Sequence, residues 1–155
     1  MSSTPTYSER LGVPLRWWVQ GTMLVATLWL AVVVALPAVA AWVITAIAMS
    51  ALAVGLWAYG AARIGVDGTT FRAGRAHIDA AYVGTASALD AGQTRRIAGV
   101  DADARAYLLL RPYLKRAVQV EITDPADPAP YWLVSTRRPE ELVSALSALA
   151  GATGR

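Results

Sequence analysis

The stretch WWVQGTMLVATLWLAVVVALPAVAAWVITAIAMSALAVGLWAYGAA, residues 17–62, decides the fold of this chain because none of its 46 side chains is charged. A transmembrane helix needs about 20 mostly apolar residues, so the stretch is long enough for two passes. Pro37 stands near its middle, and a proline breaks the hydrogen-bond pattern of a helix. The sequence therefore predicts a membrane-spanning hairpin, with helices over residues 17–36 and 39–59 and a reversal at Pro37.

The charges that flank this stretch predict its orientation. Arg10 and Arg16 precede the first helix, and Arg63, Arg72 and Arg75 follow the second, whereas the turn between them is uncharged. Basic residues favour the cytoplasmic side of a membrane. We therefore expect a cell-membrane protein with two spans and both termini in the cytoplasm. The side chains expected to anchor it at the membrane interface are Trp17, Trp18, Trp57, Tyr59 and Arg63.

The distribution of charged and apolar residues divides the chain into four segments. Residues 1–16 are expected to form a cytoplasmic N-terminal segment, residues 17–61 the hairpin, residues 62–150 a cytoplasmic domain and residues 151–155 a tail. Beyond Ala62 the apolar residues alternate, as in the strand predicted over residues 117–123. Turns are predicted at Asp67-Gly68 and at residues 73–75. Further strands are expected over residues 64–66, 69–72, 76–79, 82–89, 107–110 and 131–135.

Two helices are predicted among these strands. A short helix is predicted over residues 90–99, with Asp90 as its N-cap. The second helix opens at Pro139 and ends at Gly151, with an apolar stripe of Leu142, Leu146 and Leu149. Six or seven antiparallel strands closed by a C-terminal helix predict an α+β domain, a barrel or sandwich of the pleckstrin-homology-like plan.

Two resemblances support this interpretation. Residues 131–142, YWLVSTRRPEEL, are similar to the last strand and Pro-started helix of bacterial pleckstrin-homology-like domains. They depart from that pattern at Arg138, where a capping Asp, Ser or Asn is expected. The segments YSERL (7–11), VP (13–14), WW (17–18), YLLLRPY (107–113), DPADP (124–128) and PYWLVSTRRP (130–139) together resemble an actinobacterial membrane family of unknown function, numbered 3093. That resemblance spans residues 7–150 and implies no known activity, so it transfers no functional residue.

The composition leaves few options for catalysis. The chain has no cysteine and a single histidine, His77, which excludes disulfides, thiolate chemistry and cysteine-ligated zinc. His77 is best interpreted as structural, and the pairs Asp101/Asp103 and Asp124/Asp127 as ordinary turns. Ser135 lacks the sequence context of a nucleophile. We therefore expect no enzyme activity, catalytic residue, metal or cofactor, and a net charge of only +3 favours no nucleic-acid partner.

Two basic sets are the candidate lipid- or partner-binding residues: Arg111, Lys115 and Arg116, and Arg137 and Arg138. The leading hypothesis is a non-enzymatic integral membrane protein that tethers a pleckstrin-homology-like interaction domain to the cytoplasmic leaflet. It would serve as a scaffold or accessory subunit, with the bilayer and a protein partner or second copy as partners. One alternative is an anionic-lipid-binding module that uses the basic turns. Another is a subunit of a membrane enzyme or transporter whose chemistry lies in another chain.

Overall fold

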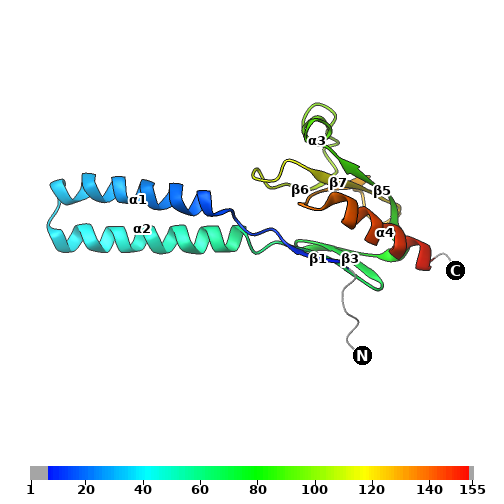
Figure 1. Ribbon diagram of the computed structural model, residues 1–155, viewed down its shortest axis with the longest axis horizontal. Helices are drawn as coiled ribbons and strands as arrows, with labels where there is room; N and C mark the ends of the chain where they lie inside the picture. Colours follow the sequence, from blue (N-terminus) through cyan, green and yellow to red (C-terminus); the bar gives the residue numbers. More distant parts are fainter. Residues whose placement is uncertain (1–6, 154–155) are drawn as a thin grey trace. The chain divides into compact units, whose positions relative to one another are not determined.

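The computed structural model describes residues 7–153 and divides the chain into two compact units. One unit is the helical hairpin, residues 12–61. The other, here called the β unit, combines residues 7–11 with residues 62–153 (Figure 1). The predicted N-terminal segment and tail lie partly outside the described residues, over residues 1–6 and 154–155.

The hairpin consists of α1 (Leu15–Ala35) and α2 (Ala38–Tyr59), which contact each other along their length. Pro37 is the N-cap of α2, so the predicted helices and their reversal at this proline are confirmed. Gly21 allows the close approach, because a Cβ built there would stand 2.7 Å from Cδ1 of Leu52. Near the turn, the ring centres of Trp29 and Trp42 lie 5.6 Å apart.

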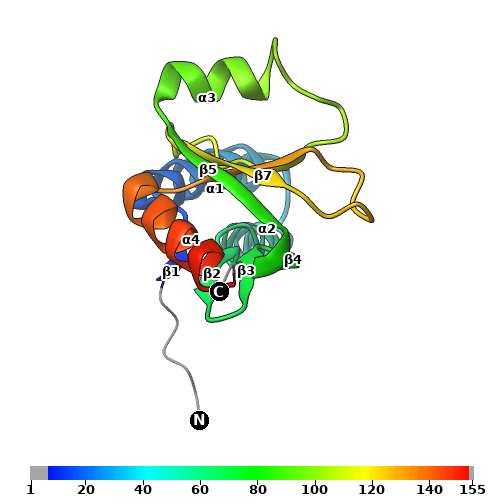
Figure 2. The ribbon, with the colours of Figure 1, turned by 90° about the vertical axis from the view of Figure 1, so that its right-hand side faces the viewer.

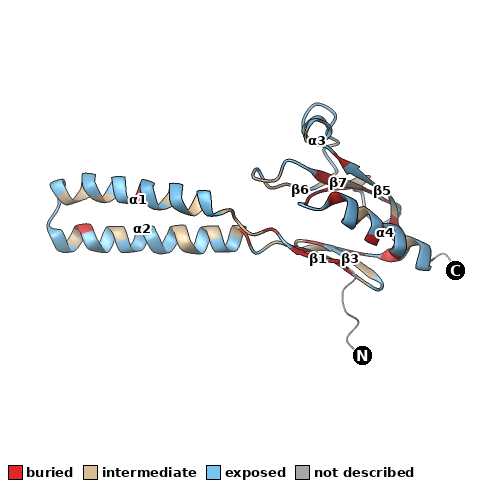
Figure 3. Ribbon diagram, in the orientation of Figure 1, coloured by how far each residue is buried: buried red, intermediate tan, exposed pale blue. Residues whose placement is uncertain are grey.

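Both helices present apolar side chains outward. Only Val25 in α1 and Ala41 in α2 are buried (Figure 3). In the most apolar 18-residue segment of each helix, 6% of the residues are buried. A core helix of a globular protein would instead be covered by its neighbours. Each helix is long and apolar enough to span a membrane.

The first sheet of the β unit contains β1 (Tyr7–Arg10), β2 (Arg63–Asp67), β3 (Thr70–Ala73) and β4 (Ala76–Asp79), in that order and antiparallel throughout. Strand β1 precedes the hairpin and pairs with β2, which follows it, so that Arg10 lies opposite Arg63. The sequence pattern predicts a separate cytoplasmic segment over residues 1–16 and no strand within it. Four alternating residues are too short a pattern to identify a strand without its distant partner.

The β2–β3 turn differs from its prediction by one residue. Asp67 pairs with Thr70, so Gly68 and Thr69 form the turn rather than Asp67-Gly68. The observed register sets Val66 opposite Phe71, and both are buried. The predicted turn would have set Val66 opposite Thr69. The next turn lies within the predicted residues 73–75, but Ala73 pairs with Ala76, so Gly74 and Arg75 form it. Gly74 adopts a φ of 65°, which favours glycine.

The second sheet has the order β5-β7-β8-β6. Its strands are β5 (Val83–Leu89), β6 (Tyr107–Leu109), β7 (Ala117–Ile122) and β8 (Tyr131–Ser135), and a 3-10 turn, η1 (Ala80–Tyr82), leads into it from β4. The predicted α+β class is confirmed. Of the predicted barrel or sandwich, the closed barrel is wrong, because the described residues form two separate four-stranded sheets, and the antiparallel prediction is wrong for β6, which runs parallel to β8. After β5 the chain passes through α3 (Ala91–Ala98) and enters the sheet at its far edge, which produces the parallel pairing.

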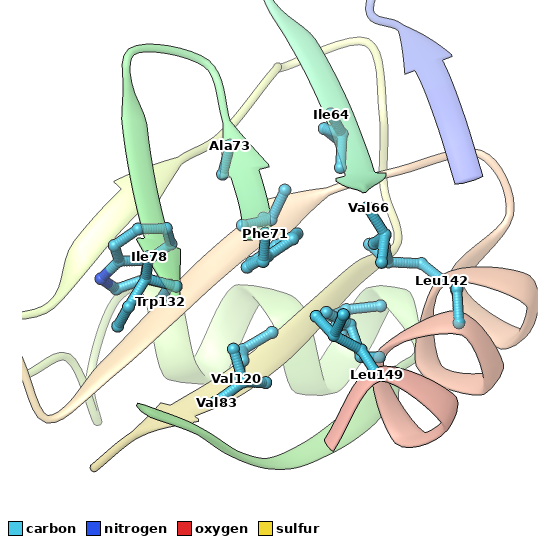
Figure 4. Close-up of a cluster of buried hydrophobic side chains, with 14 of the residues drawn as sticks. Ile64, Val66, Phe71, Ala73, Ile78, Val83, Val120, Trp132, Leu142 and Leu149 are labelled. Carbon is cyan, nitrogen blue, oxygen red and sulfur yellow. The ribbon is translucent and has the colours of Figure 1, made fainter. Parts of the chain in front are cut away.

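The core lies between the two sheets and α4 (Pro139–Thr153), which packs against β1, β2, β5 and β7. Figure 4 shows side chains of β2, β3 and β4 meeting those of β5, β7, β8 and α4. Leu142, Leu146 and Leu149 are buried, as the predicted stripe requires. The helix continues past Gly151, where exposed glycine costs only about 1 kcal/mol.

The short helix α3 lies on the opposite face of β5 and β7 from α4 (Figure 2). Its predicted cap is confirmed, because the Asp90 carboxylate accepts from the Gln93 N–H while the Gln93 side chain accepts from the Asp90 N–H. Ile97 packs against a small cluster that includes Leu133. The second sheet is therefore packed on both faces.

Candidate functional site

The most organised polar site in the described residues surrounds Glu9. This glutamate points inward from β1 and is 6% exposed. Its Oε2 accepts hydrogen bonds from the Tyr7 hydroxyl, at 2.7 Å, and from the Thr136 hydroxyl. Its Oε1 accepts from the backbone N–H of Arg137, at 3.1 Å. We call Tyr7, Glu9, Thr136 and Arg137 the Glu9 clasp, because it joins β1 to the segment between β8 and α4.

An ion pair between Arg137 and Glu9 adds to the hydrogen bonds of the Glu9 clasp. Nη1 of Arg137 lies 3.7 Å from Oε1 of Glu9 and also donates to the carbonyl oxygen of Arg10, at 3.1 Å. A buried carboxylate is costly unless it is paired and hydrogen-bonded, and Glu9 has both kinds of partner. The arrangement therefore suits a structural connection between distant segments of the chain.

Tyr7 is kept neutral in this environment. Burial raises the pKa of Tyr7 to about 12, and the hydrogen bond to Glu9 and the charge of that carboxylate act in the same direction. The Thr136 hydroxyl and Arg138 oppose the rise, and the Arg138 guanidinium carbon lies 5.3 Å from the centre of the Tyr7 ring. Tyr7 therefore acts as a hydrogen-bond donor rather than as a proton-transfer group near neutral pH.

The structure brings the two predicted basic sets together. The backbone N–H of Arg111 donates to the Ser135 hydroxyl at 3.1 Å, and the Thr136 N–H donates to the Arg116 carbonyl oxygen at 3.2 Å. The two turns are thus neighbours at one end of β6, β7 and β8.

Three of these five basic side chains are paired with carboxylates inside the chain. Arg116 pairs with Glu140, Arg137 with Glu9, and Arg138 with Glu141 at 2.9 Å. Glu140 lies in the first turn of α4, and its hydrogen bond to the backbone there, together with Arg116, lowers its pKa. At the start of α4, the Arg138 N–H donates to the Thr136 hydroxyl at 3.1 Å, and the Arg138 carbonyl oxygen accepts from the Leu142 N–H at 3.1 Å. Lys115 is exposed.

The other sequence candidates have local roles. Asp103 pairs with Arg105 at 3.1 Å, which lowers its pKa, and Asp101 pairs with Arg96 at 3.5 Å. Asp124 and Asp127 each accept a hydrogen bond from the backbone N–H two residues ahead, as expected for ordinary turns. His77 is exposed on β4, opposite Arg72. Among residues 7–153, no three His, Cys, Asp or Glu side chains gather closely enough to hold a metal ion.

Sequence reasoning missed the Glu9 clasp. The signal was the alternation of Tyr7, Glu9 and Leu11, which places all three on one face of a strand and buries all three. A glutamate at such a position indicates a partnered buried charge only when its partner is known. That partner, Arg137, is far away in the sequence.

Comparisons with known proteins give a family and no activity. No curated protein and no solved structure matches the chain. The expected actinobacterial origin and the pleckstrin-homology-like relationship stay predictions. The model of the family described as "Protein of unknown function (DUF3093)" matches residues 6–146, which is most of the chain, and the protein therefore belongs to that family.

Proposed function

We propose that this protein is a two-span protein of the cell membrane, with both termini in the cytoplasm, whose hairpin anchors the β unit as an interaction module. In this proposal it is a non-enzymatic scaffold or accessory subunit that works with a protein partner or a second copy of itself. The β unit takes the role expected of a pleckstrin-homology-like domain, although as two open sheets rather than a barrel.

The observation that carries the proposal is the way the chain enters and leaves the hairpin. Arg10 and Arg63 lie opposite each other on β1 and β2, and the Leu11 N–H donates to the Ala62 carbonyl oxygen at 2.9 Å. Both connections to the hairpin therefore start from one pair of strand ends. A hairpin that crosses a bilayer twice returns to the side on which it began, which matches this pairing.

Two further features support membrane insertion. The exposed surface of both helices is apolar and carries no charge between residues 17 and 62, and in a bilayer this surface would be in contact with lipid. Trp17 and Tyr59 stack at 6.2 Å at the end of the hairpin where α1 begins and α2 ends, and aromatic residues are enriched at membrane interfaces.

Labelling of single cysteines tests the topology, because the natural chain has none. Ala38→Cys marks the turn of the hairpin and Lys115→Cys the β unit; both residues are exposed. In intact cells, a membrane-impermeant maleimide should label Ala38→Cys and spare Lys115→Cys, and inverted vesicles should reverse the result. Recovery of the chain in the soluble fraction, or labelling of both positions from outside, would contradict the proposal.

The scaffold role is tested by crosslinking in native membranes, followed by size analysis of the purified complex. We expect a defined assembly larger than one chain. A strictly monomeric protein with no reproducible crosslinked neighbour would leave membrane anchoring intact and overturn the scaffold role.

A further inference from the structure

The outer face of the first sheet carries a cluster of basic residues that differs from the two basic turns. Its members are Arg10 on β1, Arg63 on β2, Arg72 on β3, Arg75 in the next turn and His77 on β4, and all five are exposed. We call this set the arginine face. Each strand buries its alternate residues in the core, so these side chains are directed away from it.

The charges on this face are ordered along the strands. In the register of the sheet, Arg10 and Arg63 form one row, and Ser8, Gly65, Arg72 and His77 form the next. The third row contains Asp67, Thr70 and Asp79, and its two aspartates are the carboxylates on the outer face of this sheet. Neighbouring strands are about 4.8 Å apart, so the basic side chains of the first two rows lie close together. The face is positive at one end and negative at the other.

No carboxylate in the described part of the chain neutralises the arginine face. The ion pairs of residues 7–153 involve Arg96, Arg105, Arg116, Arg137 and Arg138. The arginines of the basic turns are thus largely matched within the chain, whereas those of the first sheet are not. A set of neighbouring like charges without internal counterions is suited to an anionic surface outside the protein.

The positive end is also the end from which the chain enters the hairpin. Arg10 stands five positions before Leu15, where α1 begins, and Arg63 stands four positions after Tyr59, where α2 ends. An extended residue spans at most about 3.6 Å, so both arginines stay within about 20 Å of the helix ends whatever the orientation of the β unit.

We propose that the arginine face binds the acidic phospholipid headgroups of the leaflet at which the hairpin enters the membrane. This inference rests on the proposed membrane insertion and identifies the surface of the β unit that meets the lipid. Guanidinium groups form paired hydrogen bonds to phosphate oxygens. The carboxylates of the third row are repelled by the same surface, so the charge gradient fixes the direction in which the β unit docks.

The test uses the full chain in nanodiscs and a fluorophore on Ser8→Cys, an exposed position in the row of Arg72 and His77. A nitroxide on the lipid headgroup quenches the fluorophore when the face docks. Quenching should be stronger in phosphatidylcholine mixed with phosphatidylglycerol than in phosphatidylcholine alone, and high salt should reduce it. A fluorophore on Ser87→Cys, exposed on the second sheet, should show no such dependence.

A matched pair of triple variants identifies the residues. Arg10→Gln/Arg63→Gln/Arg72→Gln should lower the ratio of docked to undocked molecules about 100-fold, since each basic residue near an anionic leaflet contributes a factor of about five. Arg95→Gln/Arg96→Gln/Arg105→Gln removes the same charge from exposed positions elsewhere on the β unit and should leave the ratio unchanged.

Equal quenching in both lipid mixtures, or equal loss in both triple variants, would overturn this inference. If the cysteine topology holds in that case, the proposed membrane anchoring survives. Failure of the chain to enter nanodiscs would overturn both.

Discussion

At the residue scale, similar arginines have different roles because of what lies beside them. Arg137 faces a buried carboxylate, and Arg116 and Arg138 face glutamates of α4. These contacts hold the C-terminal helix and the N-terminal strand in place. Arg10 and Arg63 have no such partner among residues 7–153 and remain exposed. In the sequence, basic residues can be grouped only by their proximity along the chain. Their roles are separated instead by whether a carboxylate lies beside them in the fold.

Glu9→Gln should destabilise the β unit by about 2–3 kcal/mol, because it removes the charge opposite Arg137 and leaves buried hydrogen-bond donors poorly matched. In circular dichroism of the detergent-purified protein, this corresponds to a fall in Tm of roughly 10 °C. Glu121→Gln, on an exposed position of β7, is the control and should change Tm little. An unchanged Tm for Glu9→Gln would show that the Glu9 clasp contributes no stability.

At the element scale, the hairpin depends on close contact between two apolar helices. In the proposed membrane setting, apolar side chains gain little by leaving lipid for a helix interface, so packing and small residues decide the association. Gly21 against Leu52 is such a contact. A Cβ built at Gly55 would meet no atom within 4 Å, so this glycine makes no close approach.

Gly21→Leu should weaken the hairpin by about 1–3 kcal/mol, because the new side chain meets Leu52. Gly55→Leu is the control and should be tolerated. Adding Leu52→Ala should restore much of the stability lost in Gly21→Leu. Thermal loss of helical circular dichroism in detergent measures all three, and equal effects of Gly21→Leu and Gly55→Leu would contradict the observed packing.

At the scale of the whole molecule, the β unit is built from two parts of the chain that the hairpin separates. Strand β1 contributes Tyr7 and nearby Leu11 to the core, and the Glu9 clasp ties it to the last strand and helix. A fragment that starts at Ala62 lacks these contacts and exposes β2 as an edge.

Replacing residues 12–61 with Asn-Gly should give a soluble, folded domain, because Leu11 and Ala62 already pair like the ends of a two-residue hairpin loop. Residues 62–155 alone should aggregate or lack a cooperative transition. Thermal unfolding and dispersion of amide resonances distinguish the two. A cooperative transition of equal Tm in the fragment would show that β1 is dispensable.

The sequence by itself determined the hairpin, its turn at Pro37, most strands and both helices of the β unit. Each depends on a local pattern: an uncharged run, alternating apolar residues, a capping aspartate or a proline at a helix start. Only the tertiary structure decided that β1 joins β2 across the hairpin, that β6 pairs in parallel with β8, and that the strands form two separate sheets rather than a closed barrel. These features depend on contacts between residues far apart in the chain, whose energies no local pattern contains. For the same reason, the structure alone separated the arginines matched by glutamates from those of the arginine face.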